Sequence, residues 1–347
     1  MPGPVEPDTP VTPGAPNYRP EVSLYTALPG MALRYGWATL GNLHERVGEE
    51  EQLRDRSDLA TDDTFNVLWV RLIGEDGNAT GAPQGIYDGG PKYDYSIAAI
   101  QAGTDVYAEQ HDNGQRDNAG LYLGAGRIRS DVTNFDGTEA GTDEVKGQSL
   151  GLYWTHFWNE GQYLDAVWQG TWSQSSAKST EGLALQDSGF GWATSLEGGY
   201  PFHDDSQVWE PQAQVIYQRV NSGQSSDPAA IVRFDDIDSL AARLGLRWAN
   251  TWKLEPSADG SPRLFTGWLR FNVWKEFKGQ PTTSFSSEDG FVPFDGSIKG
   301  SWSQLNAGLT WELDKNTSFY ANVGYQHGFG SGDFDAWDGK FGFRWNW

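Results

Sequence analysis

The sequence has 347 residues, a net charge of −22 and no cysteine, which excludes disulfide scaffolds, thiol catalysis and cysteine-ligated zinc sites. The strongly acidic balance argues against a nucleic-acid partner, because lysine and arginine must neutralise phosphate. No apolar run of about 18 residues exists, which excludes a transmembrane helix, yet there are 17 Trp, 17 Phe and 14 Tyr. Many aromatics in a polar chain fit a barrel with a wet interior and aromatic girdles, and fit a carbohydrate-binding β protein less well.

The N-terminal segment, residues 1–17, is rich in proline, threonine and acidic residues, which predicts a disordered linker. Its start, Met1-Pro-Gly-Pro, lacks the basic end and apolar core of a signal peptide. We therefore expect that an exported form of the protein is represented here by a mature fragment or by a chain with an added methionine.

Residues 18–50 predict a linker and one helix, which we expect to begin at Pro29, a residue suited to a first helical turn, and to end near Arg46. Such a helix of about 18 residues is roughly 27 Å long, close to the hydrocarbon thickness of a membrane. The alternative is an ordinary amphipathic helix on the surface of a domain. The apolar positions of this segment are Met31, Leu33, Leu40, Leu43 and Val47.

From residue 66 onward, apolar and polar residues alternate with a period of two, the pattern of β-strands with two different faces. The alternation is plain at Leu305, Ala307, Leu309 and Trp311. The predicted strands are 66–76, 91–107, 118–130, 146–158, 161–174, 188–203, 207–220, 236–252, 263–277, 299–313, 317–328 and 337–347. Most are about as long as a tilted membrane strand must be, so we expect an antiparallel up-and-down β-barrel of about 12 strands over residues 51–347.

The connections between these strands alternate in length. Those at 159–162, 203–206 and 313–316 are tight. Those at 131–145, 175–187, 221–235 and 278–298 are long and rich in Gly, Ser, Thr and Asp, whereas 253–262 breaks the rule. Short turns on one side and long loops on the other are typical of outer-membrane barrels, whose even strand number places both ends in the periplasm and the long loops outside.

The strand faces predict which residues meet lipid and which meet the lumen. A barrel of about twelve strands has room for a single helix or a narrow water channel, and the N-terminal helix is the natural occupant. We expect Arg46 either to pair with a lumen carboxylate or to be solvated at the helix end. The residues expected on the helix or in the lumen are Arg34, Asn42, Arg46, Arg71, Asp165, Gln169, Glu210, Gln212, Gln214, Arg243, Arg247, Arg270, Asn272 and Glu312.

The last seven residues carry an aromatic side chain at every odd position, with Gly342, Arg344 and Asn346 between them. One face of this strand is therefore wholly aromatic. An exposed hydrophobic edge at the end of a soluble protein would invite aggregation, whereas a barrel in lipid needs that face and closes the edge. The tail also resembles the assembly signal of outer-membrane proteins, formed here by Phe341, Phe343, Trp345 and Trp347.

Three features that suggest chemistry favour simpler interpretations. The pattern Gly147-Gln-Ser149-Leu-Gly151 matches a nucleophile elbow but opens an alternating strand rather than a strand–turn–helix unit. The five histidines are too far apart in sequence for a ligand pair, and the acidic loops lack the order of calcium ligands in an EF-hand. We expect no enzymatic activity, no cofactor and no metal.

Several motifs, in their order and spacing, resemble the translocator barrel of a type V autotransporter of the pertactin-like type. The resemblance runs from about Tyr18 to Trp347. The segments that carry it are Tyr18–Tyr25, Leu40–Arg46, Trp69–Arg71, Ser149–Trp154, Tyr163–Asp165, Ser195–Tyr200, Glu210–Gln214 and the aromatic terminus. The family cleaves some passengers at an Asn–Asn pair, and residues 17–50 contain none.

This resemblance implies an integral protein of the bacterial outer membrane that exports an N-terminal passenger and keeps the linker helix in its pore. It implies as partners outer-membrane lipid, the barrel-assembly machinery, periplasmic chaperones and a passenger domain, and we expect a monomer. Four alternatives stay open: an open porin, an adhesin with ligand-binding loops, an enzyme barrel, and a soluble β-sandwich lectin.

Overall fold

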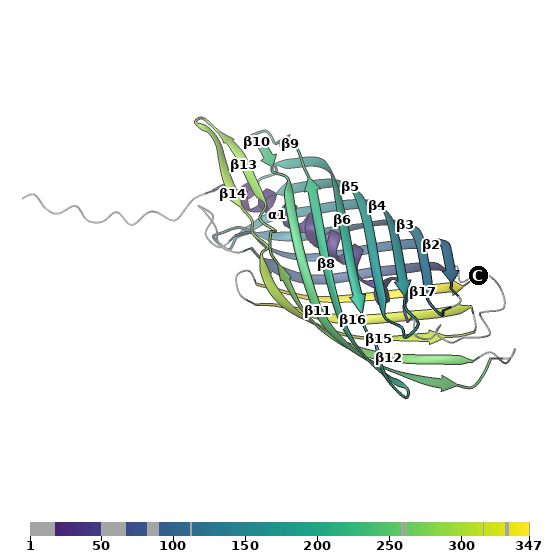
Figure 1. Ribbon diagram of the computed structural model, residues 1–347. Helices are drawn as coiled ribbons and strands as arrows, with labels where there is room; N and C mark the ends of the chain where they lie inside the picture. The colour runs from purple at the N-terminus through teal and green to yellow at the C-terminus, as the bar shows by residue number, and fades with distance from the viewer. Residues whose placement is uncertain are drawn as a thin grey trace, which may run out of the picture.

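Twelve antiparallel strands close into a barrel around an N-terminal helix (Figure 1), which confirms the predicted fold class. This computed structural model describes residues 18–49, 67–81, 90–111, 113–257, 260, 262–314, 316–329 and 333–346. The predicted linker, residues 1–17, and Trp347 at the end of the predicted assembly signal lie outside the described residues.

Each of the twelve predicted strands overlaps one barrel strand. The barrel strands are β1 (Val67–Thr80), β2 (Lys92–Gln110), β3 (Arg116–Thr133), β4 (Glu139–Phe157), β5 (Tyr163–Ser179), β6 (Ala184–Gly199), β8 (Gln207–Asn221), β11 (Ile237–Leu254), β12 (Arg263–Glu276), β15 (Gly300–Glu312), β16 (Thr317–Phe329) and β17 (Asp333–Asn346). A three-residue strand, β7 (Phe202–Asp204), pairs with β8 in the same register as β6 and continues the line of β6.

Two of the four connections predicted to be long loops are mostly strand, and that part of the prediction is wrong. The strands β3 and β4 reach to Thr133 and Glu139, and β5 and β6 reach to Ser179 and Ala184. The outer face is charged there, so the alternation of apolar and polar residues disappears although the backbone ladder continues.

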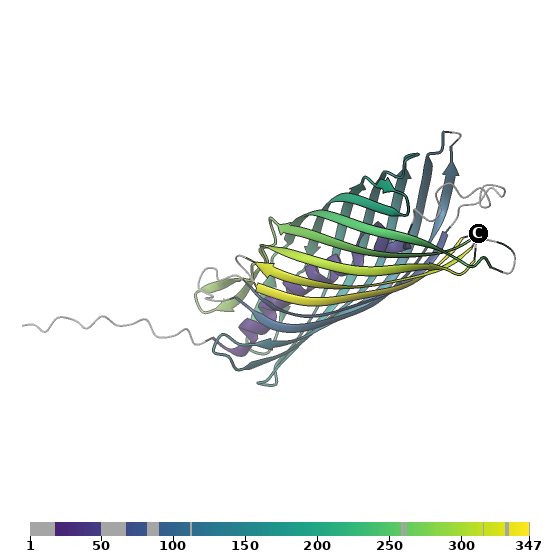
Figure 2. The same cartoon turned by 90° about the horizontal axis from the view of Figure 1, so that it is seen from below.

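The other two long connections build a second sheet at one end of the barrel. Its strands are β9 (Gln224–Ser226), β10 (Ile231–Phe234), β13 (Thr282–Ser287) and β14 (Gly290–Asp295), in the order β14-β13-β10-β9. Figures 1 and 2 show this small sheet at the end where the helix begins, opposite the C-terminus.

The barrel closes through its first and last strands. β1 pairs antiparallel with β17 from Val67 opposite Asn346 to Thr80 opposite Asp333, and β8 pairs with β11 where the two halves of the sheet meet. Closure leaves no unpaired edge, which a strand surrounded by hydrocarbon requires.

The pore helix is longer than the sequence predicts and has a break. α1 spans Pro20–Leu40 and α2 spans Leu43–Val47, with Asn42 as the cap of α2. The predicted start at Pro29 is wrong, because Pro20 occupies the first turn and Pro29 lies inside the helix. An interior proline costs a hydrogen bond, and burial on every side supplies the packing that supports the helix here. Neither described helix is long and apolar enough to cross a membrane.

The two faces of the barrel wall are the reverse of those in a soluble barrel. The outer face exposes large apolar side chains, with Leu244 at 70% and Leu123 at 63% of their surface, whereas the inner face buries arginines such as Arg243 and Arg270. The alternating apolar residues of β11, β15 and β16 lie on the outer face, and a soluble sandwich does not have this arrangement.

Inside the wall, aromatic rings lie flat over glycines of the next strand. The ring of Tyr320 on β16 covers Gly342 on β17, and a Cβ atom at Gly342 would approach the ring to 2.0 Å. The hydroxyl of Tyr320 then reaches the backbone carbonyl of Arg46 in α2. One glycine therefore allows a strand contact and a helix contact together.

This geometry predicts that Gly342→Ala destabilises the refolded barrel by about 1–3 kcal/mol, because the added methyl group displaces a buried ring. The unfolding midpoint in urea, followed by tryptophan fluorescence in vesicles, measures the effect. Gly339→Ala on the same strand is the matched control, since its Cβ would meet only a carbonyl oxygen at 3.7 Å. Equal midpoints for the two variants would contradict the argument.

Candidate functional site: the pore helix and the charged lumen

The first half of α1 is held by apolar packing and by one acidic anchor at its start. Tyr25 stacks on Phe285 of β13 with ring centroids 6.0 Å apart. Asp227, in the connection between β9 and β10, accepts a hydrogen bond from the Tyr25 hydroxyl and lies 3.0 Å from Nη1 of Arg19. Burial acts to raise the pKa of Asp227, but hydrogen bonds from two backbone N–H groups and the Tyr25 hydroxyl, together with the Arg19 charge, hold it below its ordinary value.

The break between the helices is held by side chains of the wall. Arg71 of β1 donates from Nη2 to the carbonyls of Thr39 at 2.8 Å and Leu40 at 3.2 Å. Gln214 of β8 donates to the carbonyl of Gly41 at 2.9 Å. A cation at the last turn of a helix compensates its unsatisfied carbonyl groups and its dipole.

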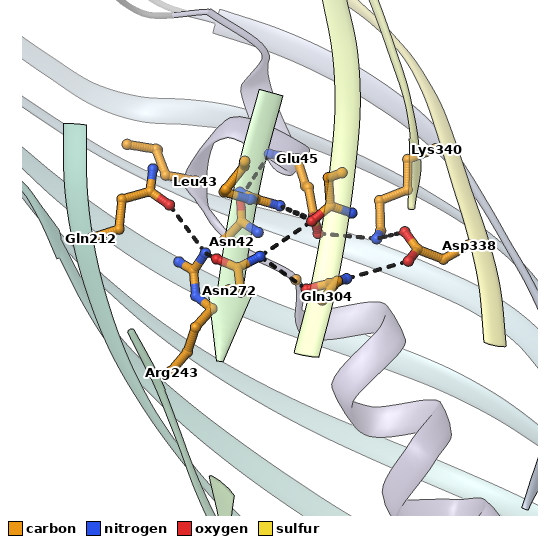
Figure 3. A network of polar contacts seen from close by, with 12 residues as sticks. Asn42, Leu43, Glu45, Gln212, Arg243, Asn272, Gln304, Asp338 and Lys340 are labelled. Carbon is orange, nitrogen blue, oxygen red and sulfur yellow. Dashed lines mark hydrogen bonds and ion pairs between the residues drawn. The ribbon is translucent and has the colours of Figure 1, made fainter. Parts of the chain in front are cut away.

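Glu45 is the centre of a polar network that joins α2 to the barrel wall (Figure 3). Its carboxylate lies 2.6 Å from Nη2 of Arg270 on β12 and 3.1 Å from Nζ of Lys340 on β17. Asn42 accepts from the backbone N–H of Glu45 and from Nη1 of Arg270 at 3.0 Å. The cap of α2 and the barrel wall therefore share one hydrogen-bond acceptor.

The network continues around the wall from β8 to β17 (Figure 3). Arg243 donates to Gln212 and to Asn272, both at 3.1 Å. Asn272 donates to Gln304, which in turn donates to Asp338 at 3.3 Å. A salt bridge from Asp338 to Lys340 at 3.0 Å completes the path back to Glu45. Several strands are thus linked to the helix through side chains.

Arg46 points to the opposite part of the wall and is paired there. Its Nη1 and Nη2 atoms donate to the two carboxylate oxygens of Asp165 on β5 at 3.1 and 2.6 Å, a bidentate contact. Thr155 of β4 donates to the same carboxylate at 2.6 Å. Of the two expectations for Arg46, the structure has the paired arrangement, with the side chain 1% exposed.

A third group of charges surrounds the end of α2. Glu49 pairs with Arg247 of β11, and Arg344 of β17 donates to the carbonyls of Val47 and Glu49, both at 3.1 Å. His44 lies 3.0 Å from Glu210 on β8. Both the side chains and the last carbonyl groups of α2 therefore have charged partners on the wall.

The predicted lumen residues lie on the two helices and the cap of α2, and on β1, β5, β8, β11, β12 and β15. The structure also shows partners that sequence reasoning missed. Arg34 donates to Tyr93 at 3.2 Å and lies over the ring of Phe334, and Glu312 is buried on the inner face of β15. The missed partners are Glu45, Glu49, Glu197, Asp338, Lys340 and Arg344. The wall residues Asp338, Lys340 and Arg344 share the strand parity of Gly342, a signal that the sequence contains.

These contacts hold a helix in place rather than activate a nucleophile or bind a metal. Ser149 of the elbow-like pattern lies within β4 and shares a hydrogen bond with Thr171 of β5 at 2.9 Å. Over the part of the chain that the structure describes, no group of three or more metal-ligating side chains is placed to bind an ion.

Comparison with solved structures shows that the barrel has the fold of several autotransporter domains. The transport unit of AIDA-I from Escherichia coli superposes with a TM-score of 0.66 at 19% identity, covering 95% of this chain and 99% of that one. The β domain of the Bordetella autotransporter BrkA gives a TM-score of 0.61 at 23% identity, with 81% and 99% covered. The translocator domain of NalP from Neisseria meningitidis gives 0.61 at 13%, with 93% and 98% covered.

Sequence relatives are much longer than this chain. The adhesin AIDA-I of E. coli is 23% identical over 329 residues, which are 90% of this chain and 24% of AIDA-I. The Sat serine protease autotransporter of E. coli is 26% identical over 192 residues, 54% of this chain and 13% of Sat. The chain therefore spans a quarter or less of these two relatives.

The sequence also matches the autotransporter β-domain family over residues 68–324, which is most of the barrel. The family identifies a translocator domain of type V secretion in the outer membrane, not an enzyme, and implies an associated passenger. The chain belongs to the autotransporter β-domain family and is an outer-membrane translocator barrel.

Proposed function

We propose that the structure is the state reached after export, in which α1 and α2 close the pore through which an N-terminal passenger has passed. The observation that carries this proposal is the seating of the helix. Glu45, Arg46 and Glu49 each pair with a wall residue of opposite charge. A helix that only passed through would have no need of matched partners on several strands.

The direction of the helix supports an orientation for the barrel. α1 begins beside the sheet of β9, β10, β13 and β14, and β17 ends at the opposite end (Figures 1 and 2). In barrels with an even strand number, the first strand begins and the last strand ends on the periplasmic side. If the start of β1 and the end of β17 lie there, the chain upstream of α1 emerges at the cell surface. We therefore assign the small sheet to the extracellular side.

The closed lumen favours this function over an open porin. α1 is buried at most of its positions, including Leu24, Tyr25, Met31 and Leu33 at 0% exposure. A helix that is apolar on all sides belongs in a packed interior. The long connections that form the small sheet pack on α1, as Phe285 and Asp227 do on Tyr25, which does not favour the adhesin alternative.

The aromatic outer face of β17 is the part of the barrel that we associate with its assembly in the membrane. Phe341 and Trp345 expose 50% and 41% of their surface to the outside of the barrel, where an aromatic girdle is placed in such proteins. We propose that this strand is presented to the barrel-assembly machinery after delivery by periplasmic chaperones. A single chain closes the barrel through β1 and β17, so we expect a monomer.

Removal of the helix is expected to open the pore. The barrel refolded without residues 1–50 should show several-fold larger single-channel conductance in a planar bilayer than the full chain, because the helix occupies the lumen. Both proteins must first give a compact, heat-modifiable band on a detergent gel. Equal conductance of the two barrels would contradict the plug.

Loss of one lumen carboxylate is expected to loosen the seated helix. Asp165→Asn leaves the Arg46 guanidinium uncompensated in a buried position, which costs about 3–5 kcal/mol. The measurement is the denaturant midpoint, together with the frequency of opening events in the bilayer. Asp236→Asn is the matched control, because Asp236 pairs with Arg219 at the surface with side chains 44% and 39% exposed, where a pair contributes about 0–1 kcal/mol. Equal effects of both variants would contradict this role for Asp165.

A further inference from the structure

The outer face of β3, β4 and β5 carries a cluster of cations in a protein with a net charge of −22. We call it the basic patch. Its four residues, all exposed, are Arg127, Arg129, Lys146 and Lys178. They lie toward the end of the barrel at which α1 begins, because β3 runs toward that end.

The basic patch lies directly above the lipid-facing band of these strands. Leu121, Leu123, Leu152 and Trp172 occupy the same outer face below it and expose between 38% and 63% of their surface. About ten residues of β3 separate Asp117 from Arg127. At about 3.3 Å per residue and a tilt of about 40°, they rise about 25 Å, the height of the apolar band of a membrane barrel. Arg127 therefore lies at the level of lipid headgroups.

Two of the cations oppose each other across the strands. Arg127 on β3 is the register partner of Lys146 on β4, and like charges directly opposite each other destabilise a sheet. Their neighbours in the same row are Ala98 on β2 and Gln174 on β5, which carry no charge. An anion between the two side chains would turn this repulsion into a favourable contact.

Within the basic patch, Glu144 is the carboxylate that pairs with the cations. Glu144 lies 2.9 Å from Nζ of Lys146 and is also paired with Arg129. Within the described ranges, the structure gives Arg127 no ion pair with a carboxylate. One shared carboxylate therefore compensates two cations, and the guanidinium of Arg127 is available to an external oxyanion.

Beside the basic patch lies an open depression of about 870 Å³ on the outer wall. Arg129 and Lys178 line it together with Ser96 and Ser176. Its carboxylates are those of Asp76, Asp94, Asp131, Asp143, Glu144 and Asp335. Its size is in the range of small-ligand sites. These carboxylates repel phosphate but accept hydrogen bonds from sugar hydroxyls, so the depression fits the saccharide part of a headgroup. The facing cations Arg127 and Lys146 fit its phosphate.

We propose that the basic patch binds the phosphorylated saccharide headgroup of an outer-leaflet lipid, lipid A, with Arg127 and Lys146 on one phosphate. The proposal rests on the orientation given under the proposed function, in which this end of the barrel faces the cell surface. Bound headgroups would fix the height of the barrel in the membrane and offset the repulsion within the patch. Arg129 and Lys178 contact the edge of the same headgroup.

The test is a titration of the full, refolded barrel in micelles, followed by native mass spectrometry. The probes are diphosphorylated lipid A and the same lipid with both phosphates removed. The unchanged barrel should prefer the phosphorylated lipid, and R127Q/K146Q should bind it on the order of tenfold more weakly. The control K275Q/K278Q removes two cations from the same end of the barrel, Lys275 on β12 and Lys278 just after it, and should stay within about twofold of the unchanged barrel.

Three outcomes would overturn the proposal. They are equal affinity for the two lipids, an equal loss in the control variant, and displacement of the lipid by millimolar inorganic phosphate, which would indicate a site for free phosphate. The heat-modifiable band confirms folding, and the single variants R127Q and K146Q, each expected to weaken binding severalfold, replace the double variant if it does not fold. Conductance of the same samples keeps the two proposals distinct, because a plugged barrel without lipid preference contradicts only this inference.

Discussion

The constraint on which the whole structure depends is that backbone polar groups in hydrocarbon must find partners within the protein. The pairing of β1 with β17 over fourteen positions satisfies it by removing the last free edge. A closed wall of twelve strands then has a fixed interior with room for one helix. The apolar outer face, the polar lumen and the place of α1 all follow from this closure.

Within the lumen, the two ends of the helical segment are held by different kinds of contact. The N-terminal half of α1 packs in an apolar cluster with the small sheet, where Tyr25 meets Phe285. Beyond Gly41, the helix is held by charges, with Glu45 between Arg270 and Lys340. Apolar packing excludes water at one end, and directional charge pairs fix the rotation and depth of the helix at the other.

Sequence patterns were sufficient for the barrel and insufficient for the pairing inside it. A period of two identifies a strand wherever one face meets lipid, so all twelve strands were predicted, but the signal fails where β3 and β4 rise into water. The parity of each strand predicted lumen positions such as Arg71 and Asp165. The partners of these residues, Lys340 with Glu45 for example, depend on the shear of the barrel and the rotation of the helix, which no local pattern encodes. The helix start was wrong because burial on every side supports Pro29 in a place where propensity alone disfavours it.

A lumen lined with charges also suits the proposed function, in which the barrel first passes a chain and then retains a helix. Buried ion pairs often add little net stability, because desolvation offsets their attraction. In the proposed function, the lumen holds water before α2 arrives, so that Asp165, Arg270 and Lys340 are hydrated and present no apolar surface to a passing segment. When α2 arrives, Arg46 and Glu45 find partners of opposite charge on opposite sides of the wall, and any other rotation of the helix would leave buried charges unpaired. The charges therefore act through specificity: they make one seating of the helix acceptable and all others costly.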